Sequence, residues 1–186
     1  GGNDKHIGME SYDATDGNST TLDQTNITGT YHSINLGGGQ LTLTKSSIGS
    51  DNNAAYDKEY SDPCIELHAL GSYVDANGHT TFGLGAKNLV TLDGSTITTT
   101  GQGGQEIDIM SGAVTLKNGS ELTSRHIQLA AMGEYTGSDN DETMTMKNNT
   151  TANAVTVADS NLTVTGSNSS SLNLGGGQIN ITGTSK

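Results

Sequence analysis

The chain has 186 residues and a formal net charge of −12, from 20 acidic and 8 basic side chains. This charge disfavours nucleic acid and anionic membrane surfaces as partners, because both would repel it. The single cysteine, Cys64, excludes an internal disulfide, and the lack of an apolar run of about 20 residues excludes membrane insertion of this segment as a helix.

A short strand pattern recurs along the chain, in which two apolar residues flank one polar or small residue. Such alternation is typical of half-buried strands, and a unit this short cannot bury its own apolar side chains. The pattern therefore predicts rungs that stack on one another, an all-β solenoid. Eight triplets fit, and in chain order they are Ile7-Gly8-Met9, Ile34-Asn35-Leu36, Ile65-Glu66-Leu67, Phe82-Gly83-Leu84, Ile107-Asp108-Ile109, Ile127-Gln128-Leu129, Met144-Thr145-Met146 and Leu172-Asn173-Leu174.

Two of these rungs have almost the same sequence around their first turn. Residues 34–43 read INLGGGQLTL and residues 172–181 read LNLGGGQINI, so that the second strand begins seven residues after the first. We expect the three glycines to provide positive φ angles where the strands change direction.

The sequence also contains a longer repeat, which is made of several short ones. Residues 90–116 align without a gap on residues 155–181, and residues 64–73 align on residues 126–135. Residues 7–43 resemble a third copy that lacks its opening rung. Three rungs are therefore expected to form one super-repeat.

Insertions between the strands are the predicted loops. The segment from Gly49 to Pro63 is the longest and most charged, and we expect it to protrude and to carry function. Residues 74–81 and 136–143 are expected to be equivalent loops in the two full copies. The chain stops after the apolar pair Ile179 and Ile181 without a polar cap, so we interpret residues 1–186 as a single β-helix domain excerpted from a longer surface protein.

The solvent-facing position of the second strand is repeatedly threonine. In stacked rungs about 4.8 Å apart, these side chains would form a ladder of hydroxyl groups. The simplest interpretation is that threonine suits a solvent-facing strand. The functional interpretations are a carbohydrate-contacting face, a self-associating face or an ice-like array. Rungs containing Ser72 and Glu134 are expected to interrupt the ladder. The candidate binding face consists of Thr21, Thr42, Thr91, Thr115 and Thr156, followed by Asn180.

The corresponding positions of the first strand carry the carboxylates Glu66 and Asp108. Glycoside hydrolysis requires two carboxyl groups flanking the bond to be cleaved. We expect these two to lie two rungs apart, with Gly83 between them, and the chain lacks the NxD, DD, HG or RxK clusters of pectin-degrading enzymes. The sequence therefore predicts no catalytic residue and no enzyme.

Metal and cofactor sites are not predicted either. Asp13, Asp16 and Asn18, and the acidic run at residues 139–142, offer oxygen ligands but do not match the spacing of known calcium loops. We interpret both as solvated acidic loops. The histidines are dispersed, which disfavours a zinc site; they are His6, His32, His68, His79 and His126.

Residues 90–101, VTLDGSTITTTG, residues 155–166, VTVADSNLTVTG, and the two LGGGQ turns carry a resemblance that covers nearly the whole chain. The pattern resembles the passenger region of bacterial autotransporter proteins and related surface adhesins, and is shared by phage tail spikes and carbohydrate-active enzymes. The resemblance implies a right-handed parallel β-helix, here of about eight rungs.

The same resemblance implies a secreted or cell-surface location and a non-enzymatic role. The domain would be a rigid stalk that presents loops for adhesion or self-association. Its partners would be glycans, a host or neighbouring cell surface, or copies of itself, with no nucleic acid and no cofactor. The alternatives are a fragment of a carbohydrate-active β-helix enzyme and an ice-binding protein with a threonine ladder.

Overall fold

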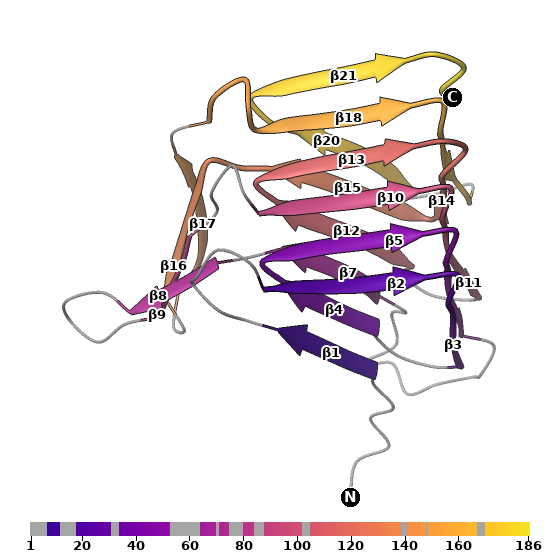
Figure 1. Ribbon diagram of the computed structural model, residues 1–186, viewed down its shortest axis with the longest axis horizontal. Helices are drawn as coiled ribbons and strands as arrows, with labels where there is room; N and C mark the ends of the chain where they lie inside the picture. Colours follow the sequence, from indigo (N-terminus) through magenta and orange to yellow (C-terminus); the bar gives the residue numbers. More distant parts are fainter. Residues whose placement is uncertain are drawn as a thin grey trace, which may run out of the picture.

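The chain folds as a parallel β-helix with three sides (Figure 1). The computed structural model describes residues 7–11, 18–30, 34–52, 64–69, 71–74, 80–83, 88–101, 105–138, 141–147, 149–166 and 170–186. Within these ranges all regular structure is β-strand, as the sequence predicted. The described segments contain no helix that is long and apolar enough to cross a membrane.

Three parallel sheets form the sides, and we call them sheets A, B and C. Sheet A consists of β1 (Ile7–Ser11), β4 (Ile34–Gly38), β7 (Cys64–Ala69), β12 (Glu106–Ser111), β15 (His126–Ala131) and β20 (Ser171–Gly175). Sheet B consists of β2 (Ser19–Asp23), β5 (Gln40–Thr44), β10 (Leu89–Asp93), β13 (Ala113–Lys117), β18 (Ala154–Ala158) and β21 (Gln178–Thr182). Sheet C consists of β3 (Asn26–Thr30), β6 (Ser47–Asn52), β11 (Thr96–Gly101), β14 (Glu121–Ser124) and β19 (Asn161–Val164). In Figure 1 sheet B runs left to right in front and sheet A returns behind it as the chain rises, which makes the coil right-handed.

Among the described residues the stack has six rungs, and the prediction of eight was wrong. Two of the predicted rungs are antiparallel hairpins outside the stack. Phe82 lies in the hairpin of β8 (Gly71–Val74) and β9 (Thr80–Gly83), and Met144 lies in that of β16 (Glu134–Ser138) and β17 (Asp141–Lys147). Both hairpins project from the same side of the β-helix, where β9 and β16 are in contact (Figure 1).

The hairpins change the composition of the super-repeat. Each full copy contains two rungs and one hairpin rather than three rungs. In the first copy, β1 pairs with β4 just as β7 pairs with β12 and β15 pairs with β20. The first copy therefore has its opening strand. The described residues of this copy contain no hairpin, and only residues 12–18 separate β1 from β2, whereas residues 70–88 separate β7 from β10.

The hydrophobic core is a set of straight files of aliphatic side chains inside the three sheets. One file in sheet A follows the strand register through Ile7, Ile34, Ile65, Ile107, Ile127 and Leu172. Ile34 to Ile127 of this file are buried, and each buried aliphatic side chain contributes roughly 1.5–3 kcal/mol. Thr99 points inward among the apolar side chains, and its hydroxyl group bonds to that of Ser124 at 2.7 Å. The predicted stacking of the rungs is confirmed.

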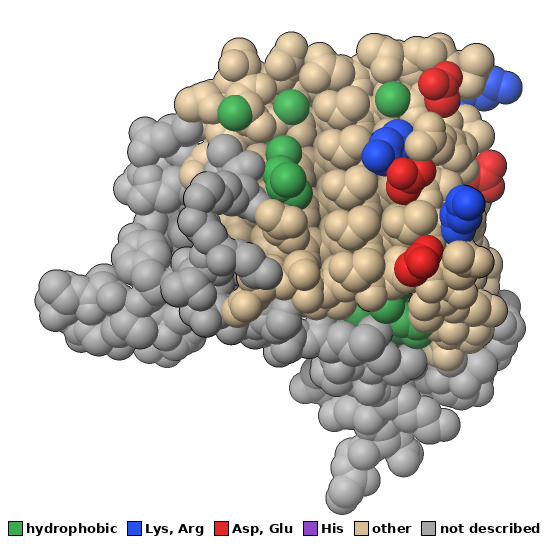
Figure 2. Space-filling view, in the orientation of Figure 1, with side chains coloured by type: hydrophobic (Ala, Val, Ile, Leu, Met, Phe, Trp, Pro, Cys, Tyr) green, Lys and Arg blue, Asp and Glu red, His purple; other side chains and the backbone are tan. Residues whose placement is uncertain are grey.

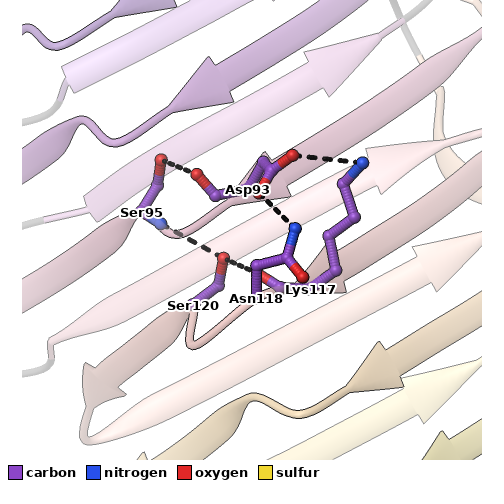
Figure 3. Close-up of polar contacts among 5 residues, drawn as sticks. All are labelled: Asp93, Ser95, Lys117, Asn118 and Ser120. Carbon is purple, nitrogen blue, oxygen red and sulfur yellow. Dashed lines mark hydrogen bonds and ion pairs between the residues drawn. The ribbon is translucent and has the colours of Figure 1, made fainter.

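A ladder of hydroxyl groups, the corner ladder, closes the tight turn between sheets B and C, and its four central members are buried. It consists of Thr25, Ser46, Ser95, Ser120, Ser160 and Ser185. The backbone N–H of Ser95 donates to the hydroxyl of Ser120 at 3.2 Å (Figure 3). In the same way, the backbone N–H of Ser46 donates to the hydroxyl of Ser95 at 3.1 Å. In five of the six turns a residue with positive φ comes just before the hydroxyl residue, and at Asn118-Gly119 there are two such residues. In the last turn the residue with positive φ is Gly183, two residues before Ser185. The corner ladder satisfies backbone groups that would otherwise be buried without partners.

The glycines of the two LGGGQ turns have a different role from the one predicted. None of them has a positive φ, and the positive φ angles occur in other turns, for example at Gly94 and Gly166. A Cβ atom on Gly39 would lie 2.8 Å from the carbonyl oxygen of Asn18, and one on Gly177 would overlap the carbonyl oxygen of Thr150. Gly39 and Gly177 are needed because another segment of backbone packs directly against them.

Candidate functional site

The predicted threonines form one unbroken column on the outer face of sheet B. The strand register places Thr21, Thr42, Thr91, Thr115 and Thr156 side by side in consecutive strands, with Asn180 next in line. The expected interruptions were wrong, because Ser72 and Glu134 lie in the hairpins. All five predicted residues are therefore brought together.

This threonine ladder faces outward from a regular surface. The threonines alternate along their strands with buried leucines and valines, such as Leu41 and Leu43 on either side of Thr42. Figure 2 shows the face as largely free of charge, with acidic and basic side chains gathered near the corner with sheet C. Each threonine offers a hydrogen-bond donor, an acceptor and a methyl group. The ladder is therefore suited to a partner with a regular, uncharged polar surface.

The charged edge of this face is organised by Asp93. Its Oδ2 lies 3.1 Å from Nζ of Lys117, and its Oδ1 accepts a hydrogen bond from Nδ2 of Asn118 at 2.7 Å (Figure 3). The hydrogen bond from Asn118 and then the bond and charge of Lys117 hold the pKa of Asp93 below its ordinary value. A lowered carboxyl pKa stabilises the fold above the unfolded-state pKa, and this contribution is lost as the pH falls through the folded-state pKa.

Asp93→Asn is expected to lower the free energy of unfolding at neutral pH by less than about 1 kcal/mol, because the pair is partly exposed to solvent. The difference from the wild type should shrink as the pH falls below the unfolded-state value of about 3.9. Urea unfolding of both proteins at a series of pH values measures this. If the difference in the free energy of unfolding stayed constant down to the lowest pH, the lowered pKa would not belong to Asp93.

A row of carboxylates and amides runs along the outer face of sheet A. It contains Glu66, Asp108, Gln128 and Asn173 in register, and the backbone register continues to position 35. Glu66 and Asp108 lie on neighbouring strands, so the prediction that they lie two rungs apart was wrong. The error arose because Gly83, the residue expected between them, belongs to hairpin strand β9.

Asp108 is held by two side chains of this face. Its Oδ2 lies 3.3 Å from Nε2 of His68, and its Oδ1 accepts a hydrogen bond from Nε2 of Gln128 at 3.2 Å. The side chains of His68 and Asp108 are only 22% and 16% exposed. Sequence reasoning missed His68, whose position two residues after Glu66 on the same face was the available signal. Both oxygens of Asp108 are already engaged within the fold.

A second hydroxyl surface, on sheet C, was not predicted. We call it the sheet C array. It is a column that contains Thr28, Gly49, Thr98, Thr123 and Thr163 in register. Its signal in the sequence was threonine at alternate positions of the third strand, as in TITTTG at residues 96–101.

Several of the remaining predicted features fall on residues that the structure does not describe. The acidic residues Asp13 and Asp16, most of the insertion up to Pro63, and the histidines His6, His32 and His79 lie outside the described residues. Within the part of the chain that is described, no group of three or more His, Cys, Asp or Glu residues is arranged to hold a metal ion.

No family model, curated protein or solved structure matches this chain. The candidate surfaces are therefore defined by their residues and geometry alone.

Proposed function

We propose that this protein is a non-enzymatic structural and adhesive module of a secreted or cell-surface protein. It acts as a rigid β-helical stalk that binds through its side faces. The observation that carries the proposal is the unbroken threonine ladder on sheet B. The resemblance to autotransporter passengers supports the same role and the same location.

Rigidity follows from how the rungs are joined. Parallel ladders link neighbouring strands on all three sides, the files of buried aliphatic side chains run through the centre, and the corner ladder locks sheets B and C together. A stalk built in this way holds its surface hydroxyl groups at a fixed spacing of about 4.8 Å. Each single hydroxyl contact is worth only about 0.5–1.5 kcal/mol. Useful affinity therefore requires a partner that meets several rungs at once.

Glycans on a cell surface and a second copy of this chain both meet that requirement. A hydroxyl group donates and accepts, so the ladder is complementary to itself in a two-fold arrangement. The central ladder carries no charge, although the chain as a whole is strongly acidic. Two copies are therefore expected to approach through sheet B rather than through an acidic segment.

Thr115→Tyr is expected to weaken adhesion or self-association by about tenfold, which corresponds to about 1.4 kcal/mol. Thr115 is near the centre of the ladder, between Thr91 and Thr156, and a tyrosine ring would prevent a flat partner from reaching its neighbours. The measurement is the binding of the labelled protein to bacterial cells and to a glycan array, with sedimentation equilibrium for self-association. Thr98→Tyr, on sheet C, is the matched control and should bind normally.

The alternative function is that of a carbohydrate-active enzyme fragment, favoured by the adjacent carboxylates Glu66 and Asp108. The observation against this alternative is that both carboxylate oxygens of Asp108 already contact side chains of the fold, those of His68 and Gln128. Hydrolysis or β-elimination of a polysaccharide that Glu66→Gln abolishes would overturn the proposed function and establish the alternative. Unchanged binding by Thr115→Tyr would instead show that sheet B is not the contact face.

A further inference from the structure

The end of the stack formed by β20 and β21 is apolar, and we propose that it binds the opposite end of a second copy of this chain. The large hydrophobic side chains that are exposed among the described residues all lie there: Leu172 is 44%, Ile179 47% and Ile181 58% exposed. In Figure 1 this end is at the top, and β1 lies at the other end of the stack. The proposed contact therefore joins two copies end to end.

The internal repeat shows what kind of surface covers this rung. Residues 172–181 have nearly the same sequence as residues 34–43, which belong to the second rung. In that rung the matching residues Ile34, Leu41 and Leu43 are 1%, 0% and 0% exposed. They are covered because β7 and β10 pair with the upper edges of β4 and β5. The sixth rung has the same apolar pattern, so a further rung of this kind fits on it.

The order of the rungs identifies the matching surface. Each super-repeat has an opening rung and a closing rung, and the opening strands of sheet A are β1, β7 and β15. The closing strand β4 is followed by the opening strand β7, and the closing strand β12 by the opening strand β15. Strand β20 closes the third copy. Among the described strands, β1 is the opening strand that pairs on one edge only.

A head-to-tail contact fits this end better than a two-fold one. Placing β1 and β2 of a second copy on β20 and β21 keeps all strands parallel, as they are within sheets A, B and C. The N–H and C=O groups at the open strand edges then pair as they do inside the stack. A two-fold contact would make the strands antiparallel and would match only one of the three sides with itself. A head-to-tail contact does not close, so further copies can add at both ends.

End-to-end stacking also extends the threonine ladder of sheet B. Thr21 and Asn180 occupy the first and last positions of this column. The same register carried across the contact places Thr21 of the second copy beside Asn180, so a longer partner could meet more rungs. This consequence rests on the function proposed for sheet B, whereas the stacking itself rests on the ends of the β-helix alone.

The experiment compares a charge placed in the contact with the same charge placed beside it. Ile181→Lys puts an ammonium group between the two ends, where burial without a partner is unfavourable. Thr182→Lys adds the charge at the next residue, which alternates to the outer face of β21. Both changes are made in the Thr115→Tyr background, which removes association through sheet B. Sedimentation equilibrium over a range of concentrations measures association, and electron microscopy of stained particles measures their shape.

Thr115→Tyr alone should form particles that lengthen with concentration without becoming wider, and the further change Thr182→Lys should leave this unchanged. Ile181→Lys should weaken the association by about tenfold or more, which corresponds to about 1.4 kcal/mol. Leu22→Lys changes β2 at the opposite end and should have the same effect. An equal mixture of the two end variants should form dimers and nothing longer, because each variant keeps one intact end.

Folding of each variant is checked by circular dichroism and thermal unfolding. If Leu22→Lys unfolds, the comparison of Ile181→Lys with Thr182→Lys still decides the matter. A Thr115→Tyr protein that stays monomeric at every concentration, or folded Ile181→Lys that associates as strongly as Thr182→Lys, would overturn the inference. Neither result bears on the function proposed for sheet B, which is measured by binding to cells and glycans.

Discussion

Replacing Ile107 by alanine is expected to lower the free energy of unfolding by about 2–5 kcal/mol. Ile107 lies near the middle of the sheet A file and is completely buried, with Ile65 below it and Ile127 above it. Truncation removes buried methyl groups and leaves a cavity that the rigid rungs on both sides cannot fill. A loss of this size is a large part of the stability of a domain of this length.

Leu172→Ala is the matched control for this change. Leu172 occupies the same file in the last rung of sheet A but is 44% exposed, so its truncation removes fewer contacts and creates no closed cavity. In a stack where each rung contacts only its neighbours, the effect should remain local to the end. Urea unfolding followed by circular dichroism measures both variants. Equal losses for Ile107→Ala and Leu172→Ala would show that the file is not the structural centre of the fold.

The inward files were predictable because they depend on two properties that a sequence displays directly. These are the period of two within a strand and the constant spacing from strand to strand. Ile34, Ile107 and Leu172 each begin the same short pattern. Their stacking could therefore be predicted without knowing how the loops fold. The threonine ladder followed for the same reason, since fixing the inward residues of a strand also fixes the outward ones.

The number of rungs was not predictable from the same pattern. An antiparallel hairpin and a parallel rung alternate with the same period, so Phe82 and Met144 fitted the template although they lie outside the stack. Every expectation that depended on counting rungs was therefore wrong. These were the distance between Glu66 and Asp108, the interruptions of the ladder, and the size of the super-repeat.

The glycine turns and the sheet C array were missed for reasons of another kind. A run of three glycines is compatible with either positive φ angles or a close backbone contact, and only the fold shows that Asn18 packs on Gly39. The threonines of sheet C lie in third strands, whose starting points are set by the tight corner turn. Those turns differ in length, since Asn118-Gly119 has two residues with positive φ where Gly94 stands alone.

Replacing Asn153 by alanine is the other substitution with a large expected effect. Asn153 is buried where the chain passes from sheet A to sheet B, and its Nδ2 donates to the carbonyl oxygens of Gly112 and Met132, both at 3.0 Å. Its Oδ1 accepts from the N–H of Thr150 at 2.9 Å. Alanine leaves the two buried carbonyl oxygens without this partner, at about 1–3 kcal/mol each. The total expected loss is several kcal/mol.

The bonds made by Asn153 join separate rungs, which makes the loss cooperative rather than local. Gly112 lies between β12 and β13, Met132 follows β15, and the backbone oxygen of Asn153 accepts from the N–H of Gly177 before β21. Asn153→Asp should be at least as damaging, because it puts a carboxylate against two carbonyl oxygens. Asn161→Ala, which removes only a long surface contact to Glu121, should stay within about 0.5 kcal/mol of the wild type. Denaturant unfolding decides the matter: if Asn153→Ala were as mild as Asn161→Ala, the corner between sheets A and B would be held by backbone hydrogen bonds alone.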